Sequence, residues 1–85
     1  MTEEEARERL DHWWKRMPEA EGIKIVKVSS SGAAPDFVVE FENSAGEKRS
    51  QTIDRVVVEL SGTERSQILG ELRVVFRSVI DELKS

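Results

Sequence analysis

The sequence predicts a two-layer α+β domain, in which two helices pack on one face of a three-stranded antiparallel sheet. Apolar residues recur at helical spacing near both ends of the chain, whereas β-branched or alternating stretches fill the middle. Short connections between these stretches favour a meander, because consecutive strands joined by short loops usually pair with each other. Both helices need a surface that covers their apolar faces, and the sheet supplies one.

The composition indicates one small globular domain that spans residues 1–85. Hydrophobic residues make up 38% of the chain and charged residues 35%, with both signs interspersed, which is typical of a folded soluble protein. A domain of this size buries only about 60–65% of its extended-chain surface. We therefore expect the core to consist of a few large side chains and the Leu, Ile and Val residues; the large ones are Trp13, Trp14, Phe37, Phe41 and Phe76.

The first helix is predicted to start at Thr2, since Thr2 and Glu5 have the spacing of a capping box. The apolar residues that follow at helical spacing are Ala6, Leu10, Trp13, Trp14 and Met17. At about 100° per residue, Trp13 and Trp14 lie on either side of the stripe centre. We expect both rings to flank the buried face, and Pro18 and Gly22 to bracket the end of the helix.

Two strands are predicted next, at 23–28 and 37–43, with a small-residue loop at 29–36 between them. The first is apolar on both faces, and strict alternation places Ile23 and Ile25 on the face away from the helices. The second strand alternates cleanly, with an inward face made of Phe37, Val39 and Phe41.

The stretch at 51–60 fits two interpretations. As a strand it would point Val56, Val58 and Leu60 inward. As a helix it would align Ile53, Val56, Val57 and Leu60 on one face, with Gly62 as its C-cap. We predict the strand, because a run of β-branched residues resists helix formation.

A final helix is predicted at about 63–84, capped by Thr63 or by Ser61, which has capping-box spacing to Glu64. One apolar stripe runs along this helix, made of Ile68, Leu69, Leu72, Val75, Phe76, Val79, Ile80 and Leu83.

The charge balance argues against nucleic-acid and membrane partners. Lys and Arg total 13 against 17 Asp and Glu, so the net charge is −4 and no basic stripe is present. No apolar run approaches the roughly 20 residues that span a bilayer. The acidic stretch MTEEEARERL lacks the features of a targeting signal, which favours a cytoplasmic location.

The sequence predicts no catalytic, cofactor or metal site, and so no enzyme. Cysteine is absent, which excludes thiolate chemistry and disulfides. His12 is the single histidine, and a metal site needs three or four ligands. We also see no indication of a small-molecule ligand.

Two surfaces are candidates for binding a protein partner. Gly70 lies opposite the apolar stripe of the last helix, with Val74 and Ser78 at i+4 and i+8. Together they form a low strip on the outer face. The second candidate is the sheet face away from the helices, where we expect Val38 and Val57 beside Ile23 and Ile25.

The function that these features favour is a stably folded domain without catalytic activity, of the kind that computational (de novo) design produces. The alternative is a natural protein-interaction module, either a homodimer or a compact inhibitor. It would use the open sheet face or the outer face of the last helix. Natural or designed origin, partner and oligomeric state stay open at this point.

Overall fold

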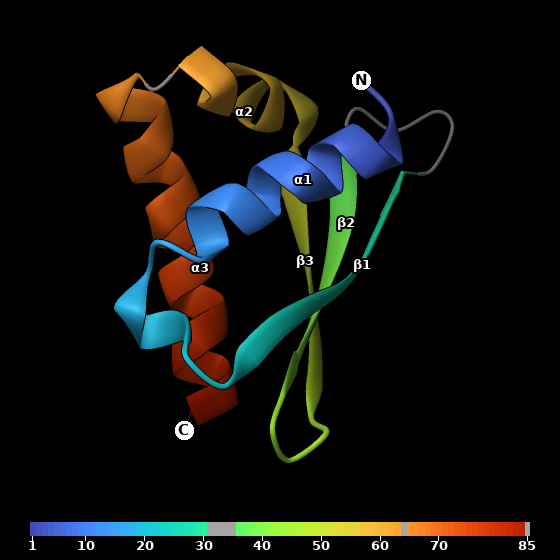
Figure 1. Ribbon diagram of the computed structural model, residues 1–85, viewed down its shortest axis with the longest axis vertical. Helices are drawn as coiled ribbons and strands as arrows, with labels where there is room; N and C mark the ends of the chain where they lie inside the picture. The colour runs from blue at the N-terminus through green and yellow to red at the C-terminus, as the bar shows by residue number, and fades with distance from the viewer. Residues whose placement is uncertain (31–35, 64, 85) are drawn as a thin grey trace.

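The computed structural model describes residues 1–30, 36–63 and 65–84. The elements, in chain order, are α1 (Glu3–Trp14), the 3-10 helix η1 (Pro18–Ala20), β1 (Ile23–Ser30), β2 (Asp36–Asn43), β3 (Lys48–Asp54), α2 (Arg55–Leu60), the 3-10 helix η2 (Ser61–Thr63) and α3 (Ser66–Lys84). The sheet order is β1-β2-β3, and both strand pairs are antiparallel. In Figure 1, α3 runs along the left side and the strands along the right, with α1 crossing near the top. The predicted α+β meander is confirmed.

One hydrophobic core joins both long helices to the same face of the sheet. Trp14 of α1 lies at its centre, with its ring 4.8 Å from the ring of Phe41 in β2 and 4.8 Å from that of Phe76 in α3. Phe37 and Val39 of β2 are fully buried in the same cluster. Because α1 and α3 share the Phe41 face, none of the described helices covers the other face of the sheet, which we call the open sheet face.

The two adjacent tryptophans are buried to different extents. Trp14 is 4% exposed, and its indole N–H donates to the carbonyl of Ile23 at 2.9 Å. Trp13 is half-buried at the rim of the core, where its ring packs against the cluster and beneath the guanidinium of Arg16. Both rings therefore flank the buried face as the helical spacing predicts, but Trp14 carries more of the packing.

The prediction that Ile23 and Ile25 lie on the outer sheet face is wrong, since both are buried in the core. The register shifts between Ile25 and Lys27, so Val26 forms an irregularity of the kind that a β-bulge produces. One extra residue reverses the alternation, and Ile25 and Val28 then share the core face. β1 also continues to Ser30, into the predicted loop, of which 31–35 lie outside the described residues.

The strand predicted at 51–60 is correct only as far as Asp54. There β3 ends and α2 follows over 55–60, so the helical alternative is correct for that part alone. Its predicted C-cap is wrong, because Ser61 caps α2 and Gly62 lies in η2. The Asp54 carboxylate accepts from the amide of Val56 at 2.9 Å and caps the new helix. Val58 is buried, whereas Val56 is 56% exposed, so the predicted inward row of valines does not form. The cap and the burial of Val58 outweigh the β-propensity of the run.

The last helix begins at Ser66, three residues later than predicted. Ser61 and Thr63 lie in η2 instead, and their hydroxyls donate back to the carbonyls of Val58 and Leu60. The predicted capping box reaches Glu64, which lies outside the described residues. The buried stripe of α3 agrees with the prediction at Leu72, Phe76, Val79, Ile80 and Leu83.

Candidate functional site

The predicted strip on the last helix forms one exposed surface. Gly70, Val74 and Ser78 all line a shallow, open depression on the outer face of α3. Val74 is 70% exposed, and a Cβ added at Gly70 would meet nothing within 4 Å. Packing within the described residues therefore gives no reason for glycine at this position. Binding of a partner by this strip stays a prediction.

The second predicted pair, Val38 and Val57, is not brought together. Val38 lies in β2 on the open sheet face, opposite Ser29 of β1 and Thr52 of β3. Val57 lies in α2 rather than in a strand, half-buried against the core. Its predicted place on the open sheet face is therefore wrong, because the chain turns into α2 at residue 55.

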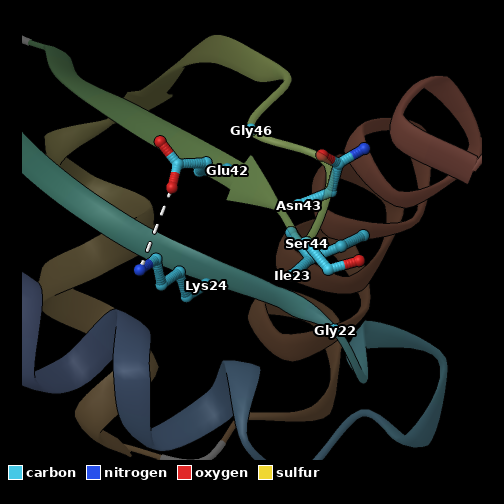
Figure 2. Close-up of a pocket in the computed structure, with 7 residues that line it drawn as sticks. All are labelled: Gly22, Ile23, Lys24, Glu42, Asn43, Ser44 and Gly46. Carbon is cyan, nitrogen blue, oxygen red and sulfur yellow. Dashed lines mark ion pairs between the residues drawn. The ribbon is translucent and has the colours of Figure 1, made fainter.

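Charged residues, rather than apolar ones, fill one end of the open sheet face. Lys24 forms an ion pair with Glu42, drawn as a dashed line in Figure 2, and the two charged groups are 3.9 Å apart. Lys48 lies 3.7 Å from the same carboxylate. Lys48 also lies 3.5 Å from Glu40. These pairs are partly exposed and contribute little stability individually. They give this end of the face a mixed charge, which does not favour an apolar partner.

Figure 2 also shows a depression where β1 begins and β2 ends, lined by Gly22, Ile23, Lys24, Glu42, Asn43, Ser44 and Gly46. The side chain of Asn43 has a structural role in this depression. Its Oδ1 accepts from the amides of Ala45 and Glu47, and its Nδ2 donates to the carbonyl of Leu83 at 3.0 Å. The amide group thus holds the β2–β3 turn and ties it to α3. Its hydrogen-bonding groups are occupied, which gives no indication of a catalytic role.

The groups that carry chemistry are scattered. His12 is exposed, and its ring stacks edge-on against Trp13, with Arg16 Nη1 3.0 Å from its Nε2. Within residues 1–30, 36–63 and 65–84, no three His, Asp or Glu side chains are grouped to hold a metal ion. The backbone and hydroxyl of Thr2 lower the pKa of Glu5, which reflects the capping box rather than a reactive carboxyl.

A more specific candidate emerges from the two edges of the sheet. We call the outward-facing backbone groups of β1 the β1 edge, and α1 covers it. Three side chains of α1 bond to this edge: the Trp14 indole donates to the carbonyl of Ile23 at 2.9 Å, the Arg7 guanidinium donates to the carbonyl of Ile25 at 3.4 Å, and the Glu3 carboxylate accepts from the amide of Ser30 at 2.7 Å. These bonds occupy backbone groups that another strand would need.

The opposite edge belongs to β3, and the register defines which of its groups face outward. The amide of Asn43 donates to the carbonyl of Glu47 at 3.0 Å, so the odd-numbered residues of β2 direct their backbone toward β3. Val39 is paired with Gln51, which therefore faces β2. Alternation leaves the even-numbered residues facing outward. We call their backbone groups the β3 edge: the amides and carbonyls of Lys48, Ser50 and Thr52, and the amide of Asp54.

The β3 edge is bonded only by side chains of its own strand, as far as the described residues show. Arg49 Nη1 donates to the carbonyl of Lys48 at 2.9 Å, and Gln51 Nε2 donates to the carbonyl of Thr52 at 3.3 Å. All four edge residues have exposed side chains. The β3 edge thus presents outward backbone groups that no other described element covers, and such groups can pair with another polypeptide.

The sequence analysis does not identify this edge, because it predicts the third strand at 51–60, whereas β3 begins at Lys48. The polar segment KRSQTID forms β3, yet the predicted strand began at Gln51 and ran into the valines. A usable signal was present: a short strand rich in polar residues, with two basic residues at its start, is typical of an edge strand.

The comparisons with known proteins give no relative: no family model, no curated protein and no solved structure matches the chain. Within the part of the chain that the structure describes, no helix is long and apolar enough to cross a membrane.

Proposed function

We propose that this chain is a non-catalytic protein-interaction module that binds an extended polypeptide segment along β3. The observation that carries the proposal is the contrast between the two sheet edges. Side chains of α1 occupy the β1 edge, whereas among the described residues the β3 edge bonds only to Arg49 and Gln51 of its own strand. In strand addition, backbone hydrogen bonds supply affinity and alternating side chains supply specificity.

The bound segment would replace the two side-chain hydrogen bonds of Arg49 and Gln51 with a series of backbone hydrogen bonds between the strands. Arg49 and Gln51 would release the carbonyls of Lys48 and Thr52, which then accept from the amides of the incoming strand. Arg49 keeps a second contact after this exchange, because its Nε lies 3.5 Å from the carboxylate of Glu82 on α3. The exchange therefore orders few new side chains of this protein, which limits the entropic cost of binding.

A second candidate surface is the outer face of α3, which the exposed Val74 and the unexplained Gly70 favour. A domain of designed origin, whose purpose is its fold, is the remaining alternative. It predicts that neither surface selects a partner. The three alternatives differ in which substitution removes binding.

The experiment is a selection of random seven-residue peptides on phage against the immobilised protein, followed by binding to two variants. Thr52→Pro removes an outward amide and places a ring where the incoming strand would lie. Val74→Asp is the matched control, since it changes the outer face of α3. We expect selected peptides to lose at least tenfold in affinity for Thr52→Pro and to keep their affinity for Val74→Asp.

Ser50→Pro serves as a second edge variant if Thr52→Pro does not fold, which circular dichroism would show. Peptides that bind both proline variants normally but lose affinity for Val74→Asp would place the site on α3 instead. Failure to enrich any peptide would contradict strand binding and favour the domain of designed origin.

A further inference from the structure

We propose that the strand bound at the β3 edge is β3 of a second copy of this chain, paired antiparallel about a two-fold axis at Gln51. This inference rests on the proposed function and names its partner. It predicts a continuous six-stranded sheet, with the helices of both copies on one face. The pairing is isologous, which means that each copy contributes the same surface.

The hydrogen-bonding pattern of β3 restricts the registers that are available. Antiparallel strands bond through residues whose amides and carbonyls both face the partner, and here these are the even-numbered residues. A two-fold axis at Gln51 places Ser50 opposite Thr52 of the second copy, and both have outward backbone groups. Gln51 itself then faces its counterpart in a non-hydrogen-bonded pair.

The charges along β3 select this register from the others. With the axis at Gln51, Lys48 lies opposite Asp54 of the second copy at each end of the ladder. An axis at Ser50 would leave Asp54 without a counterpart, and an axis at Thr52 would leave Lys48 without one. Of these three axes, only the one at Gln51 uses all seven residues of β3 and pairs Lys48 with Asp54. Opposite charges across a strand pair stabilise it.

The surroundings of both charged residues allow this pairing. Asp54 uses Oδ1 to cap α2, which leaves its second oxygen for a cation. Lys48 already lies 3.5 Å from Glu40 and 3.7 Å from Glu42, so Asp54 of the second copy would extend an existing acidic cluster around the ammonium group. All these side chains lie on the open face, away from α1 and α3.

We expect the dimer to be weak. One seven-residue strand pair buries less surface than the roughly 1,200–2,000 Å² that is typical of stable complexes. We expect a dissociation constant in the range of about 10⁻⁵ to 10⁻³ M, as for a weak and transient contact. Sedimentation equilibrium from low micromolar to about millimolar protein therefore covers the transition.

The decisive test reverses charges. Lys48→Glu places two acidic residues opposite each other at both ends of the ladder, and Asp54→Lys places two basic ones. We expect each variant alone to dimerise at least tenfold more weakly than the wild type. An equimolar mixture restores both opposite-charge pairs in a heterodimer, so its association should return to the wild-type level. Lys24→Glu is the control, because it makes the same charge change on β1 beside Glu42.

A crosslink tests the axis itself. The chain has no cysteine, so Gln51→Cys introduces a single thiol next to its counterpart, at a spacing that a disulfide can bridge. With oxidised glutathione we expect a covalent dimer to form much faster than for Lys24→Cys. This test does not depend on the Asp54→Lys variant. That variant loses the cap of α2, and circular dichroism would check whether it still folds.

Several outcomes would overturn the self-pairing. Wild-type protein that stays monomeric at all concentrations contradicts it, while peptides that still bind the β3 edge would leave the proposed function intact. A dimer that Lys48→Glu does not weaken, or that Val74→Asp abolishes, assigns the contact to another surface. A mixture of the two charge variants that stays as weak as either alone contradicts the register.

Discussion

The two edges of this small sheet differ in which residues bond to their outward backbone groups. Glu3, Arg7 and Trp14 of α1 bond to backbone groups of β1. In the part of the chain that the structure describes, the outward groups of β3 receive such bonds only from its own Arg49 and Gln51. A meander of three strands always has two outer strands. Here the helix at the start of the chain covers one of them, and the cover is made of side chains rather than backbone.

The cover depends on a line of residues along α1. At about 100° per residue, Glu3, Arg7 and Trp14 fall within roughly 40° of one another on the helix surface. They can therefore all reach β1, and Trp14 also belongs to the buried stripe of α1. β3 has no such helix beside its outward groups among the described residues: α3 contacts the core side of that strand, through the pair of Glu82 with Arg49.

The largest effect on stability is expected at Trp14, because its ring packs in the core and its indole N–H also bonds to the β1 edge. Trp14→Ala should lower the free energy of unfolding by about 3–5 kcal/mol. Trp13→Ala should cost about 1–2 kcal/mol, because that ring is only half-buried. Urea unfolding of both variants makes the comparison.

Trp14→Phe separates the two roles of Trp14. It keeps an aromatic ring in the core but removes the donor to Ile23, so a loss of about 1–2 kcal/mol is expected. Equal losses for the alanine variants of Trp13 and Trp14 would contradict the asymmetry between the two rings.

The sequence predicts the packing of this fold well and its edges poorly, for physical reasons. Helical spacing around Leu10 and Phe76 and the alternation around Val39 reflect burial, which leaves a periodic pattern. The irregularity at Val26 leaves none, because a single inserted residue looks like any other strand residue. The cap at Asp54 is a local signal that three valines obscured.

The candidate site was harder to predict than the fold. The strip at Gly70, Val74 and Ser78 follows from helix geometry alone, and the structure places these residues together on one surface. The β3 edge consists of backbone groups, which every residue carries. Its availability depends on what the other elements leave uncovered, and that is a property of the tertiary structure.

Opening the β1 edge should have a smaller effect than removing Trp14. Glu3→Gln weakens the acceptor of the Ser30 amide, which we expect to cost about 1 kcal/mol and to speed hydrogen exchange at that amide. Glu4→Gln is the control, since it removes a charge from the same turn without a described bond to β1. If exchange at Ser30 is unchanged in Glu3→Gln, then α1 does not protect this edge.

The smallest effect on stability is expected for Gly70→Ala, which tests whether α3, rather than the β3 edge, contacts a partner. A methyl group at Gly70 meets nothing within 4 Å, and the position is helical. Gly70→Ala should therefore stabilise the protein by about 0.5 kcal/mol, mainly by restricting the unfolded chain. Because no partner is expected at this face, the gain should be the same at two protein concentrations a hundredfold apart.

A close helix–helix contact at Gly70 would reverse that result. The added methyl would push the partner helix away, so Gly70→Ala would be less stable than the wild type. The difference would also grow with concentration, since each tenfold change in an association constant corresponds to about 1.4 kcal/mol. Urea unfolding at both concentrations distinguishes the two cases. If the gain in stability of Gly70→Ala is independent of concentration, then the glycine is not kept for a partner on the outer face of α3. The β3 edge then remains the surface whose backbone groups can bond to a partner.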